Sequence, residues 1–309
     1  MNNKKRTPRG RDIHGILLLD KPAGITSNDA LQIVKRMYNA SKAGHTGSLD
    51  RPATGMLPIC FGEATKFTSY LLNADKHYLA QCRLGVTTTT GDADGEITIT
   101  HAVPDNLSVN AINNVLAQFK GEILQVPPMY SALKHKGQRL YALAYQGIEV
   151  EREPRPVTIY DIHLTDFATA SFGIAVHCSK GTYIRTLVED IGNQIGCGAH
   201  ITSLVRNAVG PFKQGMISQS ELAHLSEQGY ESLDSQLLPI DAVIQDLPEI
   251  TLSGSVSRYL GQGQPVIVPH APTSGMLRLY DQDHRFLGVA EVLDDGRIAP
   301  RRLVNTDQV

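Results

Sequence analysis

The chain has 309 residues, of which 41% are hydrophobic and 19% are charged. This length exceeds the size at which a single hydrophobic core stops growing, so one large domain followed by a smaller one is predicted. The longest apolar run, residues 16–19, is far too short to cross a bilayer, which needs about 20 residues. The four cysteines form no CxxC pair and are expected to be reduced and buried. These features exclude extensive disorder and predict a soluble, cytoplasmic protein.

The net charge of −2 argues against a strongly basic nucleic-acid binder. The charges are nevertheless unevenly distributed, because residues 1–21 are rich in Lys and Arg whereas residues 214–257 contain neither. A basic, flexible tail is therefore predicted over residues 1–12. One surface of the folded protein can still be positive.

Strand and helix signals alternate along the first part of the chain. The expected elements are a strand at 15–22, a helix capped by Ser27, a helix at 63–73, strands at 77–85 and 97–100, and a helix at 109–119 capped by Ser108. The helix after Ser27 carries Leu31, Val34 and Tyr38 on one apolar face. This order is typical of an α+β fold.

The pattern changes at residue 125. Residues 125–156 combine aromatic side chains with several Lys and Arg, a composition that suits contact with an RNA backbone. The regular elements then resume, with strands at 157–166, 172–179 and 201–209 and a helix at 182–195. A new unit begins at Pro248, with one short helix and several strands that include a hairpin at 277–280 and 286–292.

A Gly-rich segment, residues 44–66, presents Asp50 between a histidine and a lysine. Its sequence, GHTGSLDRPATGMLPICFGEATK, contains four glycines and two prolines. Loops of this kind let the chain approach a ligand closely, and catalytic residues concentrate in them. Aspartate is also a common turn residue, so the segment alone leaves both interpretations of Asp50 open.

Several motifs together resemble one enzyme family. They are GILLLDKPAGITS at 15–27, GHTGSLD and ATGMLPICFGEATK within 44–66, DKHY at 75–78, GDADG at 91–95, VPPMYSALKHKGQRLYALAYQGIEV at 126–150 and CSKGTYIRTLVEDIG at 178–192. With them, the chain resembles the bacterial tRNA pseudouridine-55 synthases, the TruB family, over nearly all of its length beyond the first dozen residues. The resemblance implies an α+β pseudouridine synthase fold with a mixed, mainly antiparallel sheet, flanking helices and a small β-rich, PUA-like C-terminal domain.

The resemblance also implies the organisation of the chain and its substrate. The expected parts are a catalytic domain over 13–247, a thumb-like insertion at about 125–155 and a PUA-like RNA-binding domain over 248–309. The insertion would grip the T arm of tRNA, and uridine 55 of the T loop would be flipped out and isomerised to pseudouridine. A monomer without guide RNA, obligate protein partner or membrane attachment is expected.

Three catalytic roles follow from the resemblance. Asp50 matches the family's nucleophile, whose attack splits one difficult step into easier ones. Arg185 matches the arginine that pairs with this aspartate, although an Arg on an amphipathic helix is more often part of an ordinary surface pair. Tyr78 matches the tyrosine that stacks on the target base and can accept its carbon-5 proton. The sequence leaves open whether Asp50 attacks the ribose or the base.

Five further positions match family residues around the substrate. Tyr183 and Leu204 match pocket-lining positions, and His45 matches the histidine that fills the gap left by the flipped uridine. Lys21 and Lys66 match positions with a structural or phosphate-facing role.

No cofactor is expected, because the isomerisation consumes no oxidant, nucleotide or metal. A metal-dependent hydrolase that uses His45 and Asp50 is an alternative, but no cluster with zinc-ligand spacing accompanies them. The GDADGE motif lacks the twelve-residue pattern of a calcium loop, so it predicts a turn with Asp92 near the pocket. No metal site is predicted.

The loop departs from the family pattern directly after Asp50. The family reads Asp-Pro-Leu-Ala-Thr-Gly, whereas this chain has Asp50-Arg51-Pro52. Because a residue before proline is held extended, the restraint moves from Asp50 to Arg51. Arg51 is predicted to face an RNA phosphate. The change also leaves open an RNA-binding or tRNA-folding module with weak or lost isomerase activity.

Overall fold

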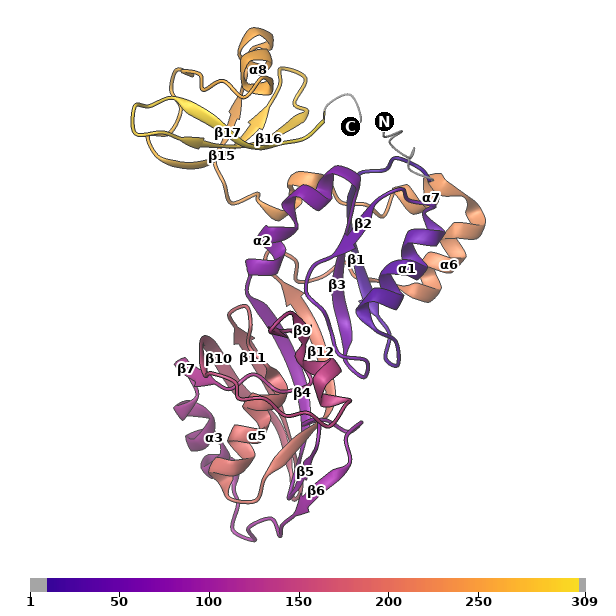
Figure 1. Cartoon of the computed structure of the whole chain (residues 1–309), viewed down its shortest axis with the longest axis vertical. Coiled ribbons are helices and arrows are strands. Elements are labelled where there is room, and N and C mark those ends of the chain that lie inside the picture. The colour runs from indigo at the N-terminus through magenta and orange to yellow at the C-terminus, as the bar shows by residue number, and fades with distance from the viewer. Residues whose placement is uncertain (1–9, 306–309) are drawn as a thin grey trace.

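The computed structural model of the chain describes residues 10–305, and its largest feature is one nine-stranded sheet (Figure 1). Its strands are β1 (Gly15–Lys21), β2 (Ala43–His45), β3 (Thr54–Phe61), β4 (Lys76–Leu84), β7 (Gly121–Gln125), β10 (Arg155–Ala168), β11 (Ser171–Cys178), β12 (Ala199–Val209) and β13 (Ile217–Ser218). They lie in the order β13-β1-β3-β12-β4-β11-β10-β7, with β2 paired to β3. The β1–β13 and β3–β12 pairs are parallel and the others antiparallel, which confirms the predicted mixed, mainly antiparallel sheet.

The β1–β3 end of the sheet is covered on both faces. The helices there are α1 (Ser27–Met37), α6 (Gln219–Gln228) and α7 (Tyr230–Asp234) on one face, and η1 (Gly62–Phe67), α2 (Thr68–Asn73) and η2 (Ile240–Val243) on the other. Tyr38 is fully buried against Phe61 and donates a 2.7 Å hydrogen bond to the carbonyl of Leu233. The single helix predicted at 63–73 is formed by two elements, the 3-10 helix η1 and the short α-helix α2.

Thr26, and not Ser27, caps α1. Its hydroxyl accepts from the Asp29 amide, and the Asp29 carboxylate accepts from the Thr26 amide in return. Ser27 occupies the first helical position, where its hydroxyl contacts Leu49 in the neighbouring loop. The prediction of Ser27 as the cap is therefore wrong. Thr and Ser both favour the N-cap position. Here the Thr26 hydroxyl caps the helix, and the Ser27 hydroxyl forms the long-range contact with Leu49.

A second hydrophobic core lies at the other end of the sheet, between its strands and two helices. Helices α3 (Val109–Gln118) and α5 (Ile184–Ile195) pack on one face of β4, β10, β11 and β12, and the hairpin of β5 (Val86–Thr88) and β6 (Ile97–Thr100) lies at its edge. Ser108 caps α3 by accepting from the Ala111 amide, as predicted. Gly91 allows its turn to approach α5 closely, since a Cβ there would come within 2.8 Å of the Glu189 carboxylate.

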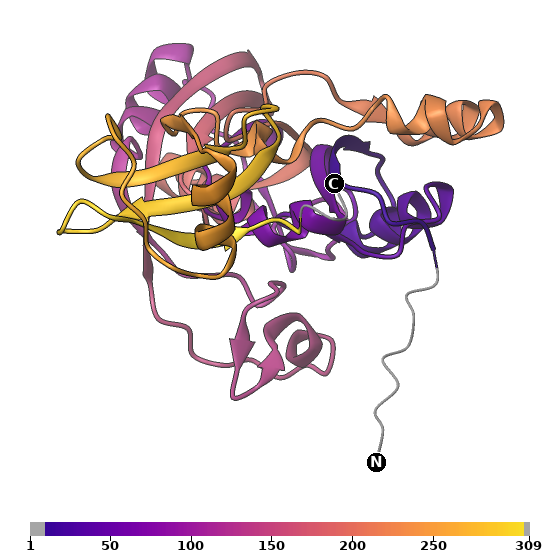
Figure 2. The ribbon, with the colours of Figure 1, turned by 90° about the horizontal axis from the view of Figure 1, so that it is seen from above.

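The segment between β7 and β10 forms a small unit of its own. It contains β8 (Lys134–His135), β9 (Gln138–Arg139) and α4 (Leu140–Ala144), and it buries Met129, Leu140 and Leu143 together. Figure 2 shows this insertion standing off the rest of the chain on two connecting stretches. Its outer surface carries Tyr141 and Tyr145, of which Tyr145 is 76% exposed.

A four-stranded sheet forms the C-terminal unit. Its elements are β14 (Glu249–Thr251), α8 (Gly254–Gly261), β15 (Gly275–Tyr280), β16 (Phe286–Val292) and β17 (Ile298–Leu303), and the predicted hairpin is β15 and β16. This unit contacts η1, where the rings of Phe67 and Phe286 lie 5.5 Å apart and Lys66 donates to the Leu303 carbonyl at 3.0 Å. The predicted small β-rich C-terminal unit is confirmed.

Three further predictions concern the whole chain. Arg11, from the predicted basic tail, forms an ion pair with Asp234 and stacks 4.0 Å from the ring centroid of Tyr230. Residues 1–9 of that tail lie outside the described residues. The four cysteines are free and buried, as predicted. Within residues 10–305, no helix is both long enough and apolar enough to cross a membrane.

Gly55 of β3 lies opposite Arg206 of β12, where the two strands approach closely. Its φ is +96°, and a Cβ there would lie 2.3 Å from the Arg206 carbonyl oxygen. We expect Gly55→Ala to lower the free energy of unfolding by about 3 kcal/mol or more, because the clash adds to a left-handed penalty of roughly 1–2 kcal/mol. Gly215→Ala is the control, since Gly215 has a φ of +83° with no atom within 4 Å of the new Cβ. Equal losses in urea unfolding would contradict the clash.

Candidate active site

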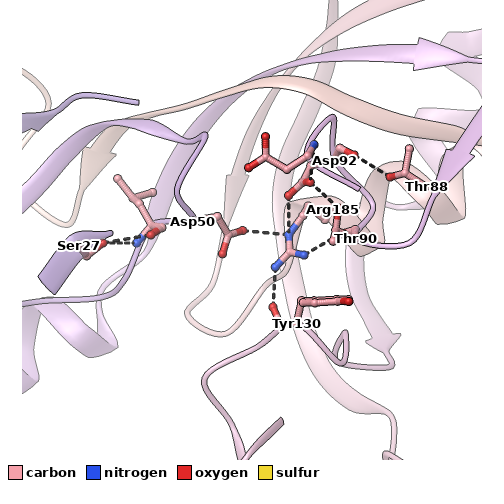
Figure 3. A network of polar contacts seen from close by, with 9 residues as sticks. Ser27, Asp50, Thr88, Thr90, Asp92, Tyr130 and Arg185 are labelled. Carbon is pink, nitrogen blue, oxygen red and sulfur yellow. Dashed lines mark hydrogen bonds and ion pairs between the residues drawn. The ribbon is translucent and has the colours of Figure 1, made fainter. Parts of the chain in front are cut away.

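The side chains of Asp50 and Arg185 form an ion pair. Asp50 lies in the loop between β2 and β3, and Arg185 lies in the first turn of α5. The Arg185 Nε is 2.9 Å from the Asp50 Oδ2 (Figure 3). The side chain of Arg185 is only 6% exposed, whereas that of Asp50 is 46% exposed. A ligand can therefore reach the carboxylate while its cationic partner stays covered.

Arg185 is held by backbone carbonyls from two other segments. Its Nη1 donates to the Thr90 carbonyl at 2.7 Å, and its Nη2 donates to the Tyr130 carbonyl at 2.8 Å. The Asp92 Oδ2 lies 3.8 Å from its Nε (Figure 3). These contacts fix the plane of the guanidinium and thus the direction in which it faces Asp50.

Burial raises the pKa of the Asp50 carboxyl, and the Arg185 guanidinium opposes this rise. The nearby Asp92 carboxylate raises the pKa further. The side chain is partly open to solvent, but the surrounding loops limit its hydration. A carboxylate with a raised pKa is more basic and hence a stronger nucleophile than an ordinary surface aspartate.

The carboxylate borders a small, partly open pocket. The pocket is lined by Asp50, Pro52, Ala53, Asp92, Ala93, Arg185, Ile201, Thr202, Ser203 and Leu204. Leu204 on β12 contributes to the apolar wall, while the polar groups gather around Arg185. An apolar recess with a few converging polar groups is the usual form of a small-molecule or base pocket.

Asp92 lies beside this pocket, as the turn interpretation predicts. Its Oδ1 accepts from the Thr90 hydroxyl and from the Asp94 amide, while the Thr88 hydroxyl donates to its carbonyl. The carboxylate is thereby oriented with Oδ2 toward Arg185. Within the described part of the chain, no group of three or more His, Cys, Asp or Glu is arranged to hold a metal ion.

Two tyrosines approach the same centre from different elements. Tyr78 lies on the central strand β4, and Tyr183 precedes α5. Gln125 holds the backbone of Tyr183 by two hydrogen bonds, of 3.0 and 3.3 Å. Burial raises the pKa of both hydroxyls, and the Asp50 charge contributes to each rise. Both hydroxyls are thus within electrostatic reach of Asp50, although neither tyrosine is among the residues that line the pocket.

Arg206 is a buried cation that the sequence did not single out. It is 1% exposed, and it donates from Nε to the Met56 carbonyl at 2.8 Å and from Nη2 to the Gly47 carbonyl at 3.0 Å. Among residues 10–305, no carboxylate lies within ion-pair distance of it. The sequence offered one signal for this residue, because Arg206 is a charged side chain within the apolar strand pattern at 201–209. A buried charge is costly and therefore suggests a specific role.

The remaining predicted residues divide into two groups. His45 and Lys21 lie near the Asp50 loop: burial lowers the pKa of both, that of Lys21 to about 8, and the Arg206 charge lowers each further. The Lys21 ammonium is fully buried and donates to the Pro22, Ile25 and Arg51 carbonyls, so its role here is structural. Lys66 pairs instead with Glu63 near the C-terminal unit, outside the pocket.

Comparisons with known proteins agree with this fold and site. The N-terminal domain of TruB family pseudouridylate synthases matches residues 35–184, and two C-terminal TruB domains match residues 185–245 and 248–304. A tRNA pseudouridine synthase B of Nitrosococcus oceani is 56% identical over 302 residues, which cover 97% of this chain and 98% of the relative. Another, of Tolumonas auensis, is 50% identical over 311 residues, with coverage of 98% and 95%.

A solved Cbf5-Nop10-Gar1 complex contains a similar fold. The match has a TM-score of 0.71 and 26% identity, and it covers 94% of this chain and 84% of the other. Fold and sequence place the chain among the pseudouridylate synthases. Within this class, it belongs to the TruB family.

Glu189 lies one turn along α5 from Arg185 and provides a test of the site's electrostatics. Burial raises the pKa of its carboxyl to about 7, against the opposing charge of Arg185. Because the folded pKa lies above the unfolded one, Glu189 contributes stability that is present below pH 4.5 and lost as the pH rises through 7. We expect Glu189→Gln to gain stability relative to the parent between pH 5 and pH 8 in urea unfolding.

The control for this variant is Glu122→Gln, which removes a carboxylate at an exposed position of β7. It tests the general effect of losing one negative charge. A stability difference between Glu189→Gln and the parent that is the same at pH 5 and pH 8 would contradict the raised pKa.

Proposed function

We propose that this chain converts uridine 55 in the T loop of tRNA into pseudouridine, with Asp50 as the nucleophile and without a cofactor. The observation that carries this proposal is the half-exposed Asp50 carboxylate, 2.9 Å from the covered Arg185 guanidinium at the edge of a pocket. The substrate class comes from relatives named tRNA pseudouridine synthase B, to which the chain is similar over nearly its whole length.

The chemistry needs a nucleophile and a closed pocket. The bond between uracil N1 and ribose C1′ breaks, the base turns, and a new bond joins C5 to C1′. N1 gains a proton and C5 loses one, so the atoms balance without an oxidant or a reductant. Asp50 supports this route because a covalent adduct holds the substrate between the two bond changes.

The neighbouring groups would orient the base. Arg185 keeps the carboxylate aimed into the pocket, and Leu204 offers an apolar wall against a uracil ring. The Tyr78 ring would stack on the base. Its oxygen would accept the C5 proton in the phenolate form, which the Arg206 guanidinium favours against the effect of burial. The buried Nδ1 of His45 has no hydrogen-bond partner among residues 10–305. This supports a contact between His45 and the RNA at the gap that the flipped uridine leaves.

Larger surfaces would hold the tRNA. The insertion at 125–155 exposes Lys134, Lys136, Arg139 and Arg155 together with Tyr145, a combination suited to phosphates and unpaired bases. We propose that it grips the T arm and that residues 248–309 form a second RNA contact. We further propose that the protein acts in the cytoplasm as a monomer without a guide RNA.

Unmodified tRNA with tritium at uridine C5 tests the reaction directly. We expect the wild type to release label from the T loop, and a tRNA with cytidine at position 55 to release none. Asp50→Asn should lower the rate by at least about 10⁴-fold while leaving tRNA binding intact, because it removes the nucleophile but preserves the shape of the side chain. The same assay with a chelator tests a metal-dependent reaction.

Binding without label release by the wild type would overturn the proposal. That outcome would favour an RNA-binding or tRNA-folding module. Loss of activity in chelator would point instead to a metal-dependent enzyme.

The phosphate contact predicted for Arg51 has a separate test. Arg51 is exposed, and its Nη2 lies 3.3 Å from the Gly24 carbonyl at the rim of the site. We expect Arg51→Ala to weaken tRNA binding and to flatten the dependence of log K on log salt by roughly 0.7–0.9, the contribution of one phosphate contact. Arg83→Ala, at an exposed position of β4, is the matched control and should leave the slope unchanged. Identical slopes for parent and Arg51→Ala would refute the contact.

A further inference from the structure

The backbone on both sides of Asp50 is held by the turn that joins β1 to α1. On one side, the Leu49 amide donates to the Ser27 Oγ at 2.8 Å, and the same hydroxyl donates to the Leu49 carbonyl at 3.1 Å (Figure 3). On the other side, the Gly24 amide donates to the Arg51 carbonyl at 2.8 Å. The residue between these two anchors is the nucleophile.

Among residues 10–305, the Ser27 hydroxyl forms hydrogen bonds only with Leu49. Thr26 caps the helix, so the Ser27 hydroxyl is not needed there. Ser27 is 3% exposed and Leu49 is 6% exposed, so water competes little for these hydrogen bonds. A buried hydroxyl that both donates to and accepts from one residue restricts the orientation of that residue's backbone.

This restriction matters because of where Asp50 lies. Its carboxylate must meet Arg185, which lies on α5, a helix whose apolar side chains pack into a different hydrophobic core. In the family pattern, a proline after the aspartate restrains its backbone, but here Arg51 follows Asp50 and the proline stands at position 52. Non-covalent restraints from the turn are therefore the ones that act on Asp50.

We propose that Ser27 is a positioning residue for Asp50, and that its hydroxyl supplies a restraint that a proline directly after the nucleophile would otherwise share. Ser27 does not touch the substrate; it acts through the backbone of Leu49. The proposal rests on the proposed function, because its main readout is pseudouridine formation.

Ser27→Ala removes both hydrogen bonds with the smallest change in volume. We expect the single-turnover rate of tritium release to fall by about 10- to 100-fold, since a displacement of 1 Å costs on the order of 100-fold, while the Kd for tRNA stays unchanged. Thr26→Ala is the control: it loses the helix cap and should lower the urea midpoint, yet retain the parent rate within about twofold. A purely structural role for Ser27 would move the urea midpoint and not the rate of the folded protein.

A second background tests the relation to the proline. The double change Arg51→Pro and Pro52→Leu returns a proline to the position after Asp50 and keeps the carbonyl at residue 51. In this background, we expect Ser27→Ala to lower the rate by less than about threefold, because the proline again restrains Asp50. The coupling between the two changes is the signature of a shared restraint.

The outcomes separate the two proposals. A wild type that binds tRNA but releases no label would overturn the proposed function. A fully active wild type together with an equally active Ser27→Ala would overturn only the positioning role. Rate losses of the same size in both backgrounds would show that the hydroxyl and the proline do not share a restraint, and would also overturn the inference.

Discussion

The ion pair between Asp50 and Arg185 is the contact on which the site depends. Asp50 belongs to a loop anchored on β1 and α1, whose apolar side chains form one core. Arg185 belongs to α5, whose apolar face packs into another core. The sheet runs through both, and β12 pairs with β3 on one side and β4 on the other. The distance between carboxylate and guanidinium is therefore set by the packing of two separate cores, and the nearby polar contacts refine it.

Buried cations around this pair are satisfied largely by backbone carbonyls. Removing a charge from water costs several kcal/mol unless polar groups replace the lost hydration. Arg206 bonds the carbonyls of Gly47 and Met56, and Lys21 bonds three carbonyls of the adjacent turns. Because a carbonyl has a fixed place in the chain, each cation ties specific points of the loops together. The Asp50 loop is thus held at both ends despite its glycines.

The sequence predicted those features that have local causes. The strand at Gly15–Lys21 and the Ser108 cap follow from hydrophobic runs and capping side chains in a few consecutive residues. The sequence did not predict that Thr26, rather than Ser27, caps α1. The Ser27 hydroxyl is used instead in a contact with Leu49, which is 22 residues away. The family motifs predicted that Arg185 pairs with Asp50, and the two side chains do form an ion pair. The motifs gave no sign that Arg185 also bonds two carbonyls, since any residue type can supply a carbonyl.

One of those carbonyls links the proposed RNA-gripping insertion to the candidate active site. The Tyr130 carbonyl, bonded to the Arg185 Nη2 at 2.8 Å, belongs to the insertion that stands off the rest of the chain. If the insertion shifts when RNA binds, this acceptor moves relative to the guanidinium, whose Nε faces Asp50. A planar guanidinium cannot turn toward one acceptor without changing its other bonds. The position of the insertion and the orientation of the Asp50 partner are therefore coupled through a single rigid group.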